Sequence, residues 1–442
     1  MGVVVPPRVP RGMRDILPDK MILRQYVEGV IREVFESFSF QPLATPAVEL
    51  AETLMGKYGP DAEKLIYDVK HREGKEDLAL RYDLSVPLCR VAAMYPELSK
   101  PFKRYQIAPV WRAERPQKGR YREFYQCDAD TVGTTSMLAD AEILNVIYEI
   151  LRRLGFRRYV IHINDRKILK GIGQFVGLQG ELLAKVYRAI DKLDKIGLEG
   201  VKDELREGGI DEPRAARLLD LLRIRGEQDE VVSALQCQLA DFPVALEGIH
   251  ELEQITGYLK AVGIPRENYA VDFAMVRGLD YYTGPIFETI VEEPKIGSIT
   301  GGGRYDDLIG LFSGKSLPAT GTTIGIERII VVMDELNMYP PDVRRTVSEV
   351  LVTVFDSGTL GASLTAAQEL RTAGFKVELY LESSQLGDQI RYALKRGIPY
   401  VVILGPDELS TGQVVVRNLE RRLQEKVERG RMVDTLHGWK LQ

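Results

Sequence analysis

The chain has 442 residues, of which 45% are hydrophobic and 28% charged, and its formal net charge is −5 at pH 7. This length exceeds one ordinary core and predicts two or three domains of a soluble globular protein. The acidic balance excludes a polycationic nucleic-acid coat, so any RNA contact must come from local basic patches.

Cysteine and histidine usage narrows the chemistry further. The three cysteines lie far apart without a CxxC pair, and none of the four histidines pairs with another at metal-ligand spacing. A disulfide framework and a structural zinc site are therefore poor fits. The N-terminal apolar run is short, so we expect no signal peptide, and no apolar run is near the roughly 20 residues of a membrane span. We expect a cytoplasmic protein without membrane association.

The first part of the chain mixes helices with antiparallel strands. Residues 19–39 predict a helix because apolar side chains recur every fourth position, and an extended stretch follows at 40–48. Short apolar and aromatic runs separated by turns make residues 67–132 typical of antiparallel strands. A second helix is expected at 136–154, where the apolar stripe is broad, and a strand at 159–163.

The character of the sequence changes twice more. Residues 166–262 are charged and amphipathic and predict an inserted helical module, after which strands return at 269–275 and 287–291. Three consecutive glycines at 301–303 predict a turn. Beyond Pro340-Pro341 the pattern alternates as β-α-β-α-β, which predicts a small, mostly parallel α/β domain. The expected domain boundaries are 1–165, 166–262, 263–340 and 343–442.

The segment from Phe102 to Asp130 carries the clearest chemical signal. Basic side chains are interleaved with aromatic ones, and Pro116 to Gly119 marks a loop between two strand-like runs. Two strands joined by an arginine-rich loop can surround a polyphosphate, because guanidinium groups pair bidentately with phosphate oxygens. A solvated charged face is the ordinary alternative for such a run.

The order of motifs resembles the class II aminoacyl-tRNA synthetases. Arg112-Ala113-Glu114, the loop and Phe124 look like motif 2, Gly321 to Arg328 like motif 3, and Thr45 to Glu49 like motif 1. Two further stretches resemble signatures of the histidyl-tRNA synthetase family, namely Arg277-Gly278-Leu279-Asp280-Tyr281-Tyr282-Thr283-Gly284 and Gly301-Gly302-Gly303-Arg304-Tyr305-Asp306. The resemblance runs from Arg11 to about Leu436.

The resemblance implies an α+β fold and a ligase activity. The expected architecture is a class II catalytic core, with an antiparallel sheet flanked by helices, divided by the helical insertion and followed by a C-terminal α/β domain of the anticodon-binding type. The expected activity is ATP-dependent activation of L-histidine and its transfer to tRNA(His). Magnesium is expected to accompany ATP, and the motif 1 region to form a homodimer.

The resemblance also assigns the ATP site. Arg112 would hold the α-phosphate and Arg277 its opposite side, and these two arginines are the expected catalytic residues. Arg120 and Arg328 would hold the outer phosphates. Adenine would stack on Phe124, with Glu114 at its amino edge. The attacking carboxylate is already ionised at pH 7, so the reaction needs charge neutralisation and positioning more than a general base.

A histidine pocket must bind an ammonium, a carboxylate and two distinct ring nitrogens. Asp130 and Tyr282 match the family positions that read the ring, and an analogue lacking either nitrogen would leave a buried polar group unpaired. By resemblance the complete histidine-binding set is Asp83, Leu84, Ser85, Arg112, Gln126, Asp130, Arg277, Tyr281, Tyr282 and Tyr305.

Each of these features has a plain structural alternative. Asp83 fits a cap at a strand end, Tyr281-Tyr282 a core pair, and Arg277 a surface ion pair. The joint occurrence of the motifs in the family's order favours the functional interpretation. A regulatory, non-catalytic relative that senses histidine is the main functional rival, but such proteins typically lack a C-terminal α/β domain. Residues 414–427 depart from the usual pattern, which leaves the anticodon contacts open.

Overall fold

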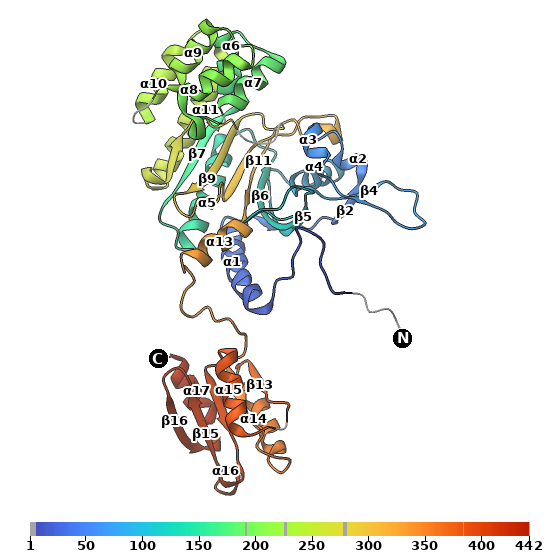
Figure 1. Ribbon diagram of the computed structural model, residues 1–442, viewed down its shortest axis with the longest axis vertical. Helices are drawn as coiled ribbons and strands as arrows, with labels where there is room; N and C mark the ends of the chain where they lie inside the picture. Colours follow the sequence, from blue (N-terminus) through green and yellow to red (C-terminus); the bar gives the residue numbers. More distant parts are fainter. Residues whose placement is uncertain (1–5, 191, 225–227, 277–280, 383, 442) are drawn as a thin grey trace. The chain divides into compact units, whose positions relative to one another are not determined.

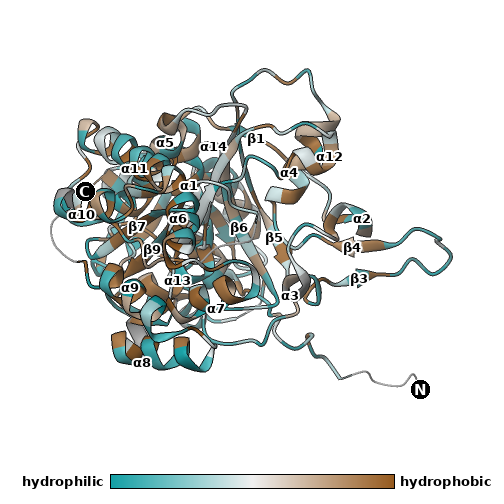
Figure 2. Ribbon diagram, turned by 90° about the horizontal axis from the view of Figure 1, so that it is seen from above, coloured by the Kyte–Doolittle hydropathy of each residue, from teal (hydrophilic) through white to brown (hydrophobic). Residues whose placement is uncertain are grey.

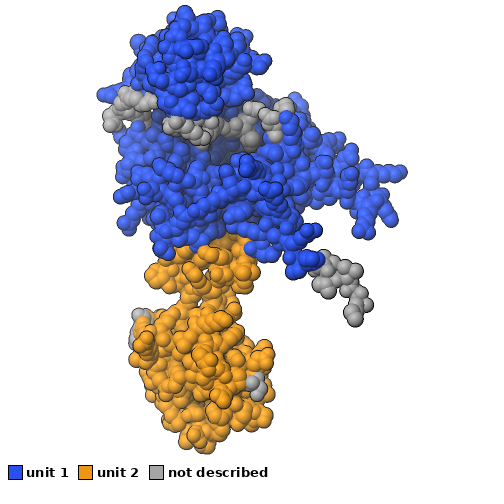
Figure 3. Space-filling view, viewed as in Figure 1, with its two compact units in different colours: residues 1–15, 27–338 blue, residues 16–26, 339–442 orange. Residues whose placement is uncertain are grey.

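The structure is a computed structural model that describes residues 6–190, 192–224, 228–276, 281–382 and 384–441. The chain forms two compact units, one of residues 1–15 and 27–338 and the other of residues 16–26 and 339–442 (Figure 3). Helix α1 (Pro18–Ser37) begins in the second unit and ends in the first. None of the helices in the described part of the chain combines the length and hydrophobicity that a bilayer crossing needs.

An eight-stranded sheet organises the first unit. Its neighbours pair antiparallel, except that β1 runs parallel to β5 and β7 parallel to β8. In spatial order the strands are β1 (Gln41–Pro42), β5 (Phe102–Trp111), β6 (Glu123–Val132), β11 (Ala319–Ile324), β10 (Thr300–Arg304), β9 (Pro285–Val291), β7 (Tyr159–Asp165) and β8 (Tyr269–Val271).

The three glycines at 301–303 lie inside strand β10, so the turn expected there is wrong. The strand is crowded on both sides. A side chain at Gly302 would lie 2.1 Å from the carbonyl oxygen of Gly321, and one at Gly303 would lie 2.6 Å from that of Pro285. Glycine is needed because neighbouring atoms fill the space a Cβ would take, and not because the chain reverses direction.

Helices cover the sheet of the first unit. Helix α5 (Met137–Arg153) starts at the Ser136 cap, whose hydroxyl accepts from the Leu138 amide, and buries its apolar stripe. The other short elements are α2 (Ala51–Leu54), α3 (Pro60–Glu63), α4 (Ser85–Met94), α12 (Gly310–Ser313), α13 (Ile326–Glu335), and a small sheet of β2 (Val48–Leu50), β4 (Leu78–Leu80) and β3 (Asp68–Val69). The β3–β4 loop is hydrophilic and extends outward (Figure 2).

The predicted helical module comes between β7 and β8 in the chain, and Figure 1 shows its helices mainly in green. Asp165 caps its first helix, because its Oδ1 atom accepts from the Lys167 amide at 2.7 Å. The elements are α6 (Arg166–Val176), α7 (Gly180–Ile190), α8 (Leu193–Glu207), α9 (Glu212–Leu222), α10 (Gln228–Gln238), α11 (Pro243–Ala261) and the short η1 (Arg266–Asn268). Helix α11 packs against α6, α5 and β7, which anchors the module to the core.

The second unit contains a five-stranded sheet in the order β13-β12-β14-β15-β16. The first three strands are parallel and the last two antiparallel, and apolar side chains alternate between two helix-covered faces. The elements are β12 (Val350–Val352), α14 (Leu360–Thr372), β13 (Val377–Leu379), α15 (Leu386–Arg396), β14 (Tyr400–Ile403), α16 (Pro406–Ser410), β15 (Gln413–Asn418), β16 (Leu423–Glu428), η2 (Arg429–Arg431) and α17 (Met432–Leu441).

Candidate active site

A cavity of about 320 Å³ opens on the central strands of the eight-stranded sheet. Strand β6 supplies Phe124, Gln126 and Asp130, which share one face because side chains alternate along a strand. The β5–β6 loop, β10, β11, the start of α13 and the segment before β9 complete the walls. Of the residues predicted to bind ligands, those that line this single cavity are Asp83, Ser85, Arg112, Glu114, Arg120, Phe124, Gln126, Asp130, Tyr281, Tyr282, Tyr305 and Arg328.

Three arginines, Arg112, Arg120 and Arg328, line the cavity. Arg112 is fixed by its Nε atom, which donates to the Tyr82 carbonyl at 3.0 Å, and its guanidinium lies 4.3 Å from the Tyr82 ring centroid. It also lies 5.2 Å from the centroid of Phe124. Arg328 projects from the first turn of α13 and donates to the Ser298 carbonyl. These contacts hold two guanidinium groups before any anion arrives, which reduces the ordering that binding requires.

Glu114 and Arg120 form an ion pair across the β5–β6 loop. Both residues line the cavity, and the Arg120 side chain is 44% exposed while that of Glu114 is 14% exposed. An exposed pair of this kind contributes little to folding stability. The pair can therefore separate at small energetic cost.

Asp83 both caps a helix and faces the cavity. Its Oδ1 atom accepts from the Tyr58 hydroxyl at 2.9 Å and from the Val86 amide at 3.0 Å. Val86 is in the first turn of α4, so this oxygen caps the start of a helix and not the end of a strand. The Oδ2 atom is buried and has no hydrogen-bond partner among the described residues. Burial raises the pKa of this carboxyl, although Arg112 and the two hydrogen bonds oppose the shift. A cation placed at Oδ2 would supply the missing partner.

Three tyrosines, Tyr281, Tyr282 and Tyr305, contribute to the wall of the cavity. The Tyr281 ring centroid lies 4.9 Å from that of Tyr282 and 5.8 Å from that of Tyr305, in edge-to-face contacts. Burial raises the pKa of all three phenols, so each keeps its proton at neutral pH and can donate a hydrogen bond. Tyr305 donates to Asp130.

The Asp130 side chain lies over strand β11, and the residue opposite it on that strand has to be glycine. Gly321 is directly opposite Asp130 in the antiparallel register, and a Cβ atom there would lie 1.9 Å from the Asp130 Oδ1 atom. On its other side Asp130 pairs with Arg104 of β5, whose Nη2 atom is 2.8 Å from Oδ2. A buried carboxylate with such neighbours is suited to accept a proton donor from a bound ligand.

Comparisons with known proteins identify the family. A sequence profile described as "Histidyl-tRNA synthetase" matches residues 12–329, and one described as "Anticodon binding domain" matches residues 349–439. The histidine–tRNA ligase of Gloeobacter violaceus is 43% identical over 448 residues, which cover 94% of this chain and 95% of that protein. The chain belongs to the histidyl-tRNA synthetase family.

Solved structures of histidyl-tRNA synthetases agree with this assignment. The enzyme from a Nostoc species superposes with a TM-score of 0.87 at 32% identity and covers 98% of this chain and 100% of its own. An ATP phosphoribosyltransferase regulatory subunit/histidyl-tRNA synthetase from Bacillus halodurans shares the fold, with a TM-score of 0.73 at 20% identity. The predicted α+β class II architecture with its C-terminal anticodon-binding domain is confirmed.

Of the described residues expected from the histidyl-tRNA synthetase resemblance, Leu84 is not among the cavity walls. Arg277 lies outside the described residues, so its expected place beside the α-phosphate stays a prediction. Leu84 is fully buried, and its carbonyl oxygen accepts from Arg104 at 3.1 Å. In this histidyl-tRNA synthetase family member, Leu84 therefore lies behind the cavity wall, where it contacts Arg104.

Sequence reasoning missed several polar residues at the site. Glu288 and Glu327 line the cavity, while Arg104 and Asp128 lie behind it and contact its lining residues. The strand period would have revealed two of them. Arg104 on β5 shares parity with Arg112, which directly follows that strand, and Asp128 shares parity with its cavity-facing neighbours on β6.

Proposed function

We propose that this chain activates L-histidine with ATP and transfers the histidyl group to the 3′ end of tRNA(His). The observation that carries the proposal is the meeting of three guanidinium groups, from Arg112, Arg120 and Arg328, with two buried carboxylates, Asp83 and Asp130, in one cavity. The first set suits a triphosphate, and the second suits the ammonium and imidazole of histidine. Kinship with histidine–tRNA ligases over nearly the whole chain supports the same activity.

The first step joins histidine to AMP. The ionised carboxylate of histidine attacks the α-phosphorus, the bond to the leaving oxygen breaks, and pyrophosphate departs. No proton has to be removed from the nucleophile, so the protein's task is to align two anions and to neutralise the charge that develops. Arg112 holds the α-phosphate, Arg120 and Arg328 hold the outer phosphates, and adenine stacks on Phe124 beside Glu114.

In the second step a ribose hydroxyl at the 3′ end of the tRNA attacks the histidyl carbonyl. A bond forms between this oxygen and the carbonyl carbon, the hydroxyl proton passes to water, and the bond from the carbonyl carbon to the phosphate oxygen breaks, so that AMP leaves with its electron pair. Opposite the phosphates, Asp83 and Ser85 bind the ammonium group, Gln126 lies beside it, and Asp130 and Tyr282 read the ring nitrogens.

Magnesium would accompany ATP and neutralise part of the phosphate charge. Among the described residues no three His, Cys, Asp or Glu side chains gather closely enough to hold a metal alone. Glu288 and Glu327 nevertheless line the cavity, and one or two carboxylates with phosphate oxygens and water are the ligands that magnesium usually takes.

The decisive test is histidine-dependent exchange of pyrophosphate into ATP, with the other amino acids as controls. Exchange with histidine alone supports the proposal. Histidine binding without exchange would instead favour a histidine-sensing regulatory role. Arg277→Ala should slow exchange by about 10²–10³-fold, as loss of a comparable charge-stabilising donor does. Arg223→Ala, which removes an exposed arginine of the helical module, is the control.

We further propose a cytoplasmic homodimer that forms through the motif 1 region, residues 45–49. Strand β2 is an edge strand of its small sheet, and its Val48 and Leu50 side chains are 38% and 42% exposed. Apolar side chains on an open edge favour pairing with another chain. Sedimentation of wild type and of a Val48→Glu/Leu50→Glu variant tests this. A monomeric wild type at micromolar concentration would contradict the proposal.

A further inference from the structure

A buried ion pair supports the histidine end of the cavity. Arg104 is directly opposite Asp130 in the β5–β6 register, and its Nη2 atom lies 2.8 Å from the Asp130 Oδ2 atom. The same Nη2 atom lies 3.1 Å from the Leu84 carbonyl oxygen, which it contacts as a donor. Asp130 lines the cavity, whereas Arg104 is absent from the described lining residues and its side chain is fully buried.

Stability alone does not account for this arrangement. Removing two charges from water costs about as much as their attraction returns, and an apolar pair of similar volume is often equally stable. Arg104 also keeps Nε and Nη1 buried without hydrogen-bond partners among the described residues, which adds to the cost. A role in shaping the neighbouring carboxylate explains why a guanidinium group occupies the site.

The surroundings of Asp130 hold it in one orientation. The Tyr305 hydroxyl donates to Oδ1, Arg104 faces Oδ2, and Gly321 leaves the room that Oδ1 occupies. The two partners approach different oxygens of the carboxylate, which fixes its plane relative to the cavity. The titratable and charged groups that face Asp130 from the elements packed around it are Arg104 on β5, Asp128 on β6, Cys89 on α4, Tyr282 before β9 and Tyr305 after β10.

We propose that Arg104 is a positioning residue for histidine recognition, because it holds the Asp130 carboxylate ionised and aimed at the imidazole ring without touching the substrate. The inference rests on the proposed function, in which Asp130 accepts a hydrogen bond from a ring N–H. An ionised carboxylate only accepts hydrogen bonds, so its charge and its orientation both decide whether it can read that nitrogen.

The neighbouring Asp128 is consistent with a role of Arg104 in keeping Asp130 ionised. Its Oδ1 atom accepts from the Thr323 hydroxyl at 2.7 Å, and it also faces Arg104. Burial, opposed by Arg104 and assisted by the nearby Asp130, raises the pKa of Asp128 to about 8. Burial likewise raises the pKa of Asp130, and Arg104 opposes the shift at both carboxyl groups, so its guanidinium is the nearby positive charge that favours the ionised form of Asp130.

The test uses Arg104→Gln in the full-length chain, with the KM for histidine measured by pyrophosphate exchange between pH 6 and pH 9. Without the guanidinium the pKa of Asp130 rises further, so its charge is lost at low pH and returns as the pH increases. The ratio of variant to wild-type KM cancels the titration of histidine itself. We expect this ratio to be about 30–100 at pH 6 and to fall severalfold by pH 9, since a buried charge-assisted contact is lost.

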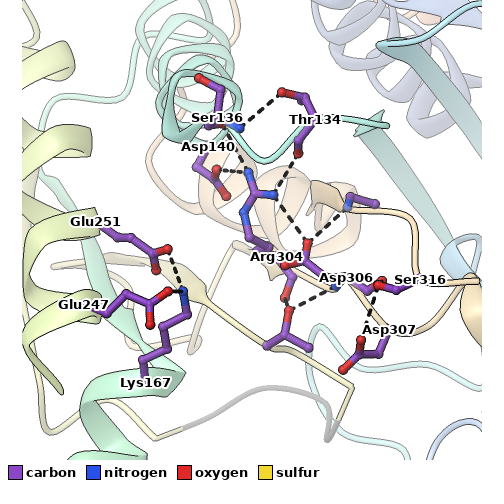
Figure 4. Close-up of polar contacts among 12 residues, drawn as sticks. Thr134, Ser136, Asp140, Lys167, Glu247, Glu251, Arg304, Asp306, Asp307 and Ser316 are labelled. Atoms are coloured by element: carbon purple, nitrogen blue, oxygen red, sulfur yellow. Dashed lines mark hydrogen bonds and ion pairs between the residues drawn. The ribbon is translucent and has the colours of Figure 1, made fainter. Parts of the chain in front are cut away.

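Two further variants separate positioning from general damage. In an Asp130→Asn background the additional Arg104→Gln change should alter the KM for histidine by less than about threefold, because no carboxylate remains to be held. Arg304→Gln is the matched control, since Arg304 is also buried and pairs with Asp140 of α5 (Figure 4). It should lower stability and give a KM ratio that does not change with pH.

The outcomes are distinct. A folded Arg104→Gln variant with the wild-type KM, or with a ratio independent of pH, would overturn the inference. If that variant does not fold, Arg104→Lys keeps the charge but loses the planar fork. It should raise the KM for histidine severalfold at every pH, and an unchanged KM would equally overturn the inference. A wild-type chain without histidine-dependent exchange would count against the proposed function instead.

Discussion

Replacement of Gly321 by alanine should damage histidine binding more than it damages the fold. The added Cβ atom would lie 1.9 Å from the Asp130 Oδ1 atom and 2.4 Å from its Cγ atom. To regain an ordinary contact near 3.4 Å, the carboxylate must move by about 1.5 Å. A shift of that size breaks the hydrogen bond from Tyr305 or the pairing with Arg104.

The energetic consequence follows from these distances. Overpacking of a buried site costs about 1–3 kcal/mol of unfolding free energy. Displacement of the carboxylate that reads the imidazole should cost about 2 kcal/mol of binding, which is roughly a 30-fold rise in the KM for histidine. The KM for ATP should stay within about threefold of wild type, because the atoms nearest the added methyl group belong to Asp130 and Ala129 and not to an arginine.

Pyrophosphate exchange gives both KM values, and urea unfolding gives the stability. Gly257→Ala on α11, where the added methyl group meets no atom within 4 Å, is the matched control. In an Asp130→Ala background the closest contacts disappear, so Gly321→Ala should then cost much less stability. A wild-type KM for histidine in Gly321→Ala, or an equal stability loss in both backgrounds, would refute the steric explanation.

Three other variants test separate parts of the molecule. Arg328→Ala should raise the KM for ATP about 10–100-fold in the exchange assay, with little change for histidine, as expected for a lost bidentate phosphate contact. Arg152 lowers the pKa of Glu149 to about 2. Glu149→Gln should therefore reduce stability at pH 7 by less than about 1 kcal/mol in thermal melts. This difference between variant and wild type should disappear as the pH falls from about 4.5 to 2. Burial and the adjacent Glu251 raise the pKa of Asp165, so the folded state holds a proton that the unfolded state has released above about pH 4. Asp165→Asn should therefore gain stability relative to wild type as the pH rises from 5 to 8, and a constant difference in urea midpoints would contradict this.

Local patterns predicted most of the elements. The helix expected at 136–154 is α5 at Met137–Arg153, and the strand expected at 159–163 is β7 at Tyr159–Asp165. The alternation after residue 343 predicted the order of strands and helices in the second unit, although β15 and β16 are antiparallel additions to the parallel strands. Periodicity succeeds here because each element buries one face.

The contacts of the site that could not be predicted from the sequence are those set by strand register. Gly321 and Asp130 are 191 positions apart in the chain, and only the β6–β11 pairing shows that one must be glycine because of the other. Arg104 appeared as one cation in a basic run, and its partner became visible when β5 and β6 were aligned. Side-chain neighbours across a sheet are set by tertiary pairing, which residue spacing does not contain.

The place of the helical module has a consequence for how such a chain can change in size. Strands β7 and β8 are hydrogen-bonded neighbours. The chain therefore leaves the sheet for the helical module and returns to it at two points about one strand spacing apart, roughly 4.8 Å. Helices α6 and α11 form a tightly packed stalk at this exit, where Gly171 lies against Ala245. The outer helices α7 to α10 can therefore be enlarged, shortened or replaced by a short linker. Helices α6 and α11 would still connect the parallel strands β7 and β8, and the strands of the active site would keep their register.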